Sequence, residues 1–156
     1  MEGAENMMKT YTVDQVANWF LSKESMSPKK LQKLTYYFEA WGNALYEESL
    51  INDTSFEAWV HGPVSPKLYH EYKEYGWREI EKRPNSDELF EDKALDLLES
   101  VWITYGDETP NSLEAITHAE YPWQKARLGL EPLENGDNVI QNKDMADYYK
   151  AIYIGD

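Results

Sequence analysis

The sequence predicts a mainly α-helical protein with a minor β element (α+β), built as a compact bundle of about six helices plus a short two-stranded hairpin or pair. Apolar residues recur at helical spacing in several separate segments, and typical N-cap residues precede several of these segments. Alternation of apolar and polar residues is confined to short runs. We expect residues 1–11 to form a flexible leader and residues 12–156 to form a single domain.

Two helices are expected at the start of this domain. Thr12 is predicted to be the N-cap of the first helix, and Gln15 completes a capping box with it. An apolar stripe of about three turns follows this cap. Ser27 and Pro28 supply the cap and the first residue of the second helix, whose apolar face continues to about Glu48.

The β element is expected in the middle of the chain. Residues 56–60 alternate in polarity, which predicts a short strand leading into the sequence HGPV. Ser65 and Pro66 then repeat the helix-start signal, and the third helix is expected to close at Gly76. Residues 77–82 are expected to form a second strand that pairs with the first around this helix.

Four further helical segments are expected in the C-terminal half, where helix-start residues and apolar periodicity recur. In chain order, they span residues 89–105, residues 113–118 with Thr109 or Asn111 as the cap, a short turn from Pro122, and the segment that follows Asn142.

The charge of the chain restricts its partners. Twenty-nine Asp and Glu residues stand against 15 Lys and Arg residues, giving a net charge of −14. Nucleic-acid binding through phosphates needs a clustered positive face, so direct binding of DNA or RNA is disfavoured. An acidic surface repels anionic membranes and suits a basic protein partner, with plain solubility as the alternative. The 12 Tyr and six Trp residues suit either an aromatic core or an interface.

Cysteine and targeting signals are absent from the sequence. The lack of Cys excludes disulfides, thiolate metal sites and cysteine catalysis. The N-terminal residues lack the apolar core of a signal peptide, and no apolar run approaches the length of about 18 residues that marks a membrane span. We therefore expect a cytoplasmic protein without a membrane segment.

No catalytic or metal-binding set stands out in the sequence. The three histidines, His61, His70 and His118, lack metal-site spacing, and the eight glycines form no phosphate-binding loop. We therefore expect no metal, no cofactor and no catalytic residue. One alternative stays open, namely a small hydrolase or transferase that uses His118 with Thr117 or Glu120.

The stretch AWVHGPVSP is predicted to be a rigid joint between a strand and a helix. Gly62 permits backbone angles that other residues resist, and Pro63 fixes the next φ. Val64 is then placed to re-enter the core. His61 lies at the corner, where its ring is expected to hydrogen-bond the backbone and stabilise the turn.

Three blocks of sequence together resemble the Panacea antitoxin domain, a family that includes phage-associated GepA-like proteins. The blocks are KLQKLTYYFEAW (30–41), FEAWVHGPVSPKLYHEYKEYG (56–76) and LEAITHAEYPWQKAR (113–127). They occur in the family's order, and the range in which they lie, residues 28 to 127, is most of the chain. The positions that match the motifs, together with His61 inside the second block, are Lys33, Leu34, Tyr36, Trp59, Gly62, Pro63, Val64, Thr117, His118, Pro122 and Trp123.

This resemblance implies a small cytoplasmic protein of a bacterium or phage that neutralises a cognate toxin by direct binding, with no enzymatic activity or cofactor. The motif residues would serve as scaffold or as partner contacts. Tyr36, Tyr46 and Tyr121 lie off the apolar stripes, so they are candidate anchors for a partner. Besides the enzyme alternative above, an acidic phage accessory protein that mimics nucleic acid is a further alternative.

Overall fold

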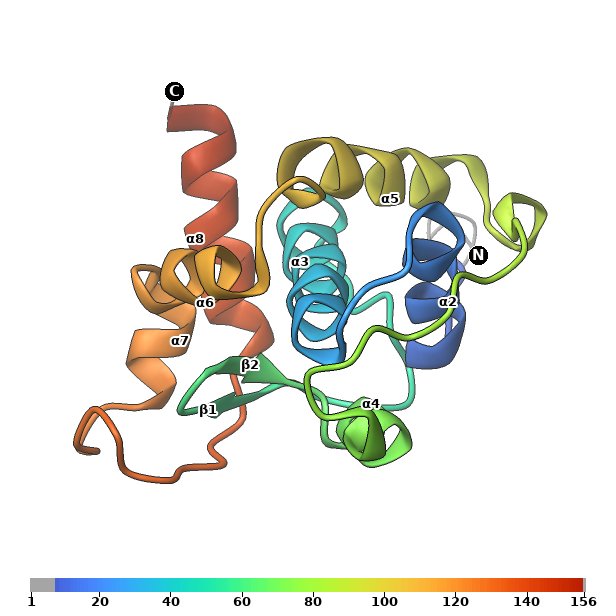
Figure 1. The fold of residues 1–156 in the computed structure, drawn as a ribbon. Helices are drawn as coiled ribbons and strands as arrows, with labels where there is room; N and C mark the ends of the chain where they lie inside the picture. Colours follow the sequence, from blue (N-terminus) through green and yellow to red (C-terminus); the bar gives the residue numbers. More distant parts are fainter. Residues whose placement is uncertain (1–7, 156) are drawn as a thin grey trace.

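A computed structural model describes residues 8–155, in which helices dominate and one small sheet is present (Figure 1). The helices are α2 (Val13–Lys23), α3 (Pro28–Tyr46), α4 (Pro66–Tyr72), α5 (Asp92–Tyr105), α6 (Pro110–His118), α7 (Tyr121–Ala126) and α8 (Asn142–Gly155). Strands β1 (Glu57–Trp59) and β2 (Gly62–Val64) form the sheet, and η1 (Lys73–Tyr75) and η2 (Asp87–Leu89) are single 3-10 turns. The predicted fold class, mainly α with a minor β element, is confirmed.

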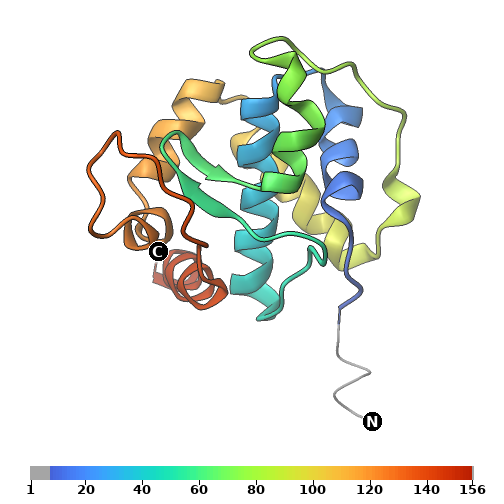
Figure 2. The ribbon, with the colours of Figure 1, turned by 90° about the horizontal axis from the view of Figure 1, so that it is seen from below.

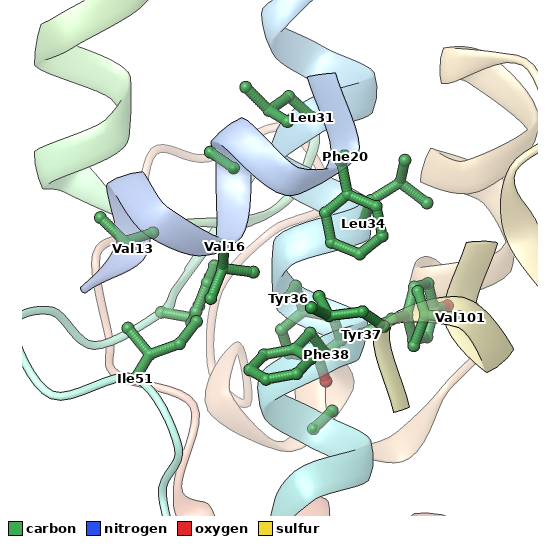
Figure 3. Packing of buried hydrophobic residues seen from close by; sticks show 14 of the residues in the cluster. Val13, Val16, Phe20, Leu31, Leu34, Tyr36, Tyr37, Phe38, Ile51 and Val101 are labelled. Carbon is green, nitrogen blue, oxygen red and sulfur yellow. The ribbon is translucent and has the colours of Figure 1, made fainter. Parts of the chain in front are cut away.

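Helix α3 is the central element of the fold. All residues from 30 to 40 are buried, because α2 and α5 cover one side of this helix and α8 packs along another (Figures 1 and 2). Figure 3 shows Phe20 of α2 beside Leu34 of α3 within this core. A Cβ on Gly42 would lie 2.9 Å from Cδ1 of Leu50, so only glycine lets the following loop approach α3 this closely.

Short side chains cap the helices where the sequence predicts helix starts. The Thr12 hydroxyl accepts a hydrogen bond from the Gln15 amide at 3.1 Å, and the Gln15 side chain accepts one from the Thr12 amide at 3.0 Å. Ser27 caps α3 and Ser65 caps α4 in the same way. Of the two candidates for α6, the structure selects Thr109, whose hydroxyl accepts from the Ser112 amide at 3.0 Å.

The expected pairing of residues 77–82 with the first strand is wrong. Strand β1 pairs instead with β2 in an antiparallel hairpin, in which Ala58 lies opposite Pro63 and residues 60–61 form the turn. Gly62 has a φ of +115°, which lets the chain reverse immediately after His61. Residues 77–82 are exposed apart from Ile80, which forms only an isolated bridge with Met26.

Three boundaries also differ from the sequence-based expectation. Helix α4 ends at Tyr72 rather than at Gly76, because the 3-10 turn η1 occupies residues 73–75. Helix α5 begins at Asp92, because Leu89 belongs to η2 and Phe90 follows it in extended conformation. At the N-terminus, Tyr11 is buried and its amide donates to the Leu50 carbonyl at 2.8 Å. The preceding part of the expected leader, residues 1–7, lies outside the described residues.

Among the helices of residues 8–155, none has the length and apolarity needed to cross a membrane.

Candidate functional site

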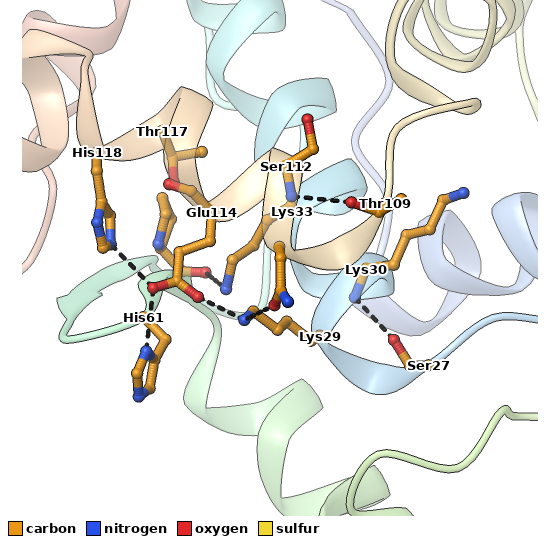
Figure 4. A network of polar contacts seen from close by, with 12 residues as sticks. Ser27, Lys29, Lys30, Lys33, His61, Thr109, Ser112, Glu114, Thr117 and His118 are labelled. Atoms are coloured by element: carbon orange, nitrogen blue, oxygen red, sulfur yellow. Dashed lines mark hydrogen bonds and ion pairs between the residues drawn. The ribbon is translucent and has the colours of Figure 1, made fainter.

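The fold brings the motif residues of three separate sequence blocks together at the hairpin (Figure 4). Lys33 comes from α3, His61 from the hairpin turn, and Thr117 and His118 from the end of α6. Glu114, one turn earlier on α6, lies at the centre of the group. Glu114 is not among the residues predicted from the sequence, although its spacing of four residues from His118 places both side chains on one helix face.

Lys33 is a buried lysine whose amino group has few hydrogen-bond partners among residues 8–155. Its side chain is almost fully enclosed, and within residues 8–155 its Nζ donates a single, long hydrogen bond of 3.5 Å to the Pro63 carbonyl. The pKa of Lys33 is lowered to about 7, chiefly by burial and also by the nearby charge of Lys29, while the Glu114 carboxylate acts in the opposite direction. A Cβ on Gly62 would lie 2.7 Å from Lys33 Cε, so the lysine packs directly against the glycine backbone.

Glu114 connects the hairpin to α3 and α6. Its carboxylate forms an ion pair with Lys29 and lies 3.1 Å from His61 Nδ1 and 3.9 Å from His118 Nε2. Burial raises the pKa of Glu114, but the hydrogen bonds and charges of Lys29 and His61 outweigh burial and lower it overall. The carboxylate is therefore held ionised between three nitrogen-bearing side chains.

The side chains of the enzyme alternative have other partners. His118 stacks on Trp123 with ring centroids 4.0 Å apart, and burial lowers its pKa. The Thr117 hydroxyl donates to the Glu114 carbonyl at 2.9 Å. Glu120 instead accepts hydrogen bonds from Tyr37 at 2.8 Å and Tyr149 at 2.6 Å. Consequently, no described hydrogen bond links the nucleophile, base and carboxylate that this alternative requires.

His61 does not hold the turn through the backbone, contrary to expectation. Its ring bonds the Glu114 carboxylate, and 71% of the side chain is exposed. Hydrogen bonds from α7 and from Arg127, the residue after it, attach the hairpin. Trp123 Nε1 donates to the Trp59 carbonyl and Arg127 Nη1 to the Ala58 carbonyl, each at 2.9 Å. Ala58 lies opposite Pro63, which has no amide hydrogen to donate, so Arg127 supplies the partner of the Ala58 carbonyl.

The other motif residues are mainly parts of the core. Leu34, Tyr36, Val64 and Pro122 are buried, and the Tyr36 hydroxyl lies 3.2 Å from that of Tyr149. Tyr36 is therefore not available as a partner anchor. Of the other two candidates, Tyr46 is half-buried and Tyr121 is exposed.

Two surface hollows meet at the hairpin turn, and we refer to them together as the hairpin groove. The first, of about 670 Å³, lies between β1, β2 and residues 133–137. The second, of about 540 Å³, lies between the turn, the ends of α6 and α7, and residues 127–133. Val60, His61 and Leu133 line both hollows. Within residues 8–155, no group of three or more carboxylate or imidazole side chains is arranged to hold a metal ion.

A comparison of the sequence with models of known protein families gives one match. The model described as "Antitoxin SocA-like, Panacea domain" matches residues 31–124, more than half of the chain. The chain belongs to the Panacea domain family. All of the motif residues above lie inside the matched range, whereas Arg127 and α8 lie beyond it. Neither a curated protein nor a solved structure matches the sequence. Membership of the Panacea family supports an antitoxin-like, non-enzymatic function in general terms.

Proposed function

We propose that this Panacea domain protein is an antitoxin that neutralises a cognate protein toxin by forming a direct complex with it, in the cytoplasm of a bacterium or of a phage-infected cell. The match to the antitoxin-like family over residues 31–124 is the observation that carries this proposal. The high negative charge of the chain also suits association with a basic protein, because complementary charge accelerates the encounter of two partners.

Polar side chains around the hairpin also favour binding over catalysis. Glu114 forms an ion pair with Lys29, and the Thr117 hydroxyl donates to a carbonyl of its own helix. The His118 ring stacks on Trp123, and Lys33 is enclosed by the domain. Their contacts join α3, α6 and the hairpin into one unit. A protein whose polar residues fix its own surface is suited to present that surface to a partner without rearrangement.

The proposal is tested with the product of the open reading frame adjacent to the gene of this chain. That protein is expressed from an inducible promoter, alone and together with this chain, and growth is recorded. We expect growth arrest in the first case, restored growth in the second, and co-purification of the two proteins at a fixed ratio. An unrelated acidic helical protein serves as the control for non-specific charge effects. If the neighbour arrests growth but this chain neither binds it nor restores growth, the proposed function is wrong.

A further inference from the structure

The hairpin groove combines exposed apolar side chains with an enclosing shape. Leu133 at its centre is 82% exposed, and Trp59 and Val60 beside it are half-buried. Such a side chain on a protein surface loses contact with water only when a partner covers it. Figure 2 shows the loop between α7 and α8, residues 127–141, alongside the hairpin, so two segments far apart in the sequence form the walls.

The rim of the groove carries negative charge. Glu131 lines one hollow and Asp137 the other, and neither carboxylate has an ion-pair partner among residues 8–155. The only Lys or Arg in either lining is Arg127, and its guanidinium donates to the carbonyls of Ala58, Glu131 and Glu134. The groove therefore presents carboxylates without a compensating cation on its surface.

The walls of the groove are fixed before any partner binds. Arg127 joins the 127–141 loop to β1, and the amide of Ala58 donates to the Asn138 carbonyl at 2.9 Å. A Cβ on Gly136 would lie 2.4 Å from Cδ1 of Leu130, so the loop also packs tightly on itself. A surface ordered in advance binds with a smaller loss of conformational entropy.

Charge decides between the possible occupants. Phosphate-bearing molecules, including nucleic acid and anionic membranes, would be repelled by the rim. A second copy of this chain carries the same net charge of −14, so pairing at this rim would bring like charges together. A segment with an apolar anchor and flanking Lys or Arg residues matches both the apolar centre and the carboxylate rim.

We propose that the hairpin groove is the docking surface for such a basic, apolar segment of a protein partner. The anchor packs between Leu133 and Val60, and the flanking cations meet Glu131 and Asp137. The inward-facing motif residues, Lys33 among them, then support this surface without contacting the partner. This inference rests on the proposed antitoxin function for the identity of the partner, and on the groove alone for its chemistry.

The chemistry is tested with two synthetic peptides and the isotope-labelled full-length chain. We expect the peptide KRLWRK to shift the amide resonances of residues 59–61 and 130–137, and the peptide EELWEE to leave them in place. Raising the salt concentration should weaken the first effect, because exposed ion pairs are screened. Absence of shifts in the groove, shifts centred elsewhere, or equal shifts from both peptides would each overturn the inference.

Variants then test the same surface in the complex with the protein encoded by the adjacent reading frame. Leu133→Ala is expected to weaken binding by about tenfold or more, the loss typical of a central anchor, and Asp137→Lys to weaken it as well. Leu128→Ala is the matched control, because Leu128 is 75% exposed in the same loop but lines neither hollow. It should change affinity by less than about twofold. Circular dichroism checks that all variants fold.

The two proposals fail in different ways. If the wild-type chain does not bind or neutralise the neighbouring protein, the antitoxin proposal fails, and the peptide experiment alone decides the chemistry of the groove. If the wild-type chain binds the neighbour and the Leu133 and Leu128 variants bind equally well, the antitoxin proposal stands and the docking surface is elsewhere.

Discussion

Single residues at the hairpin show why the motif has this composition. Gly62 adopts a φ of +115° and also lies against Lys33 and Thr117, so two independent constraints act at one position. The conformational constraint is predictable from the Gly-Pro pair in the sequence. The packing constraint depends on Lys33 of α3 and Thr117 of α6, which are 29 and 55 residues away from Gly62 in sequence. No local sequence pattern reveals it.

Replacement of Gly62 by Ala should therefore destabilise the protein strongly. A Cβ would be strained at this φ and would overlap Lys33 Cε, so we expect a loss of roughly 3 kcal/mol in the free energy of unfolding. Gly129→Ala is the control, because Gly129 has a φ of +90° and no atom near the added Cβ. It should lose only about 1 kcal/mol. Urea unfolding measures both, and equal losses would show that packing against Lys33 adds nothing.

Lys33 should make stability depend on pH. Its pKa is about 7 in the folded protein and 10.5 in the unfolded chain, so between these values the unfolded chain binds more protons. The free energy of unfolding should therefore rise with pH, by up to about 1.4 kcal/mol per pH unit. The window from about pH 7.5 to 8.5 lies well below the titration of unfolded tyrosines, whose pKa is about 10. The charged or titratable groups that face Lys33 from the surrounding elements are Lys29, Glu114, His61 and His118.

Urea unfolding at several pH values tests this expectation in the wild type, in Lys33→Met and in Lys82→Met. Lys33→Met should remove most of the rise, because methionine fills the same space without a proton to release. Lys82 is exposed, so its replacement should leave the slope unchanged. A slope in Lys33→Met equal to that of the wild type would mean that Lys33 remains charged in the folded protein.

At the scale of whole elements, helices were predictable and the second strand was not. Cap residues followed by Pro mark helix starts through local chemistry, so Ser27 and Ser65 were assigned correctly from sequence. Residues 62–64 contain Gly and Pro, which disfavour strands, yet they pair with β1 because the turn places them there. Residues 77–82 were expected to form a strand, but tertiary packing leaves only Ile80 buried in that segment.

Helix α8 is attached to the core through a shared carboxylate, and this attachment makes a testable prediction. The Tyr149 hydroxyl donates to Glu120 and contacts Tyr36, and burial raises the pKa of Glu120. Tyr149→Phe removes one donor from a half-buried acid, so we expect a loss of about 2 kcal/mol. Tyr148→Phe is the matched control, since the Tyr148 hydroxyl has no hydrogen-bond partner among residues 8–155, and it should lose less than about 0.5 kcal/mol. Equal losses by thermal unfolding would contradict this role for the Tyr149 hydroxyl.

The candidate site was partly predictable at the same scale. The motif blocks identified Lys33, Thr117, His118 and the hairpin residues, because local sequence carries them. Glu114 was missed, because its contact with His61 forms only when the hairpin packs on α6. Trp123 and Arg127 were missed as hairpin donors, because their hydrogen bonds to backbone carbonyls depend on how α7 packs on β1. Arg127 leaves no recognisable signal, because a buried arginine is indistinguishable in sequence from one on the surface.

At the scale of the whole molecule, the net charge of −14 sets how stability responds to salt. Most carboxylates lie on the surface, where their mutual repulsion opposes the compact state. Salt screens this repulsion over a Debye length that falls from about 30 Å at 0.01 M to about 10 Å at 0.1 M. The folded protein should therefore be more stable at higher salt, even though its exposed ion pairs are weakened by the same screening.

Urea unfolding at about 0.01 M and about 0.3 M NaCl tests this balance, because urea itself is uncharged. We expect the urea midpoint to rise with salt. Replacing the exposed carboxylates Glu79, Glu88, Glu99 and Asp107 by their amides removes four negative charges and changes the net charge from −14 to −10. None of the four makes an ion pair within residues 8–155, so this variant should be at least as stable as the wild type at low salt and respond less to added salt. A midpoint that falls with salt in the wild type would mean that ion pairs such as Lys150–Glu47 contribute more than the repulsion opposes.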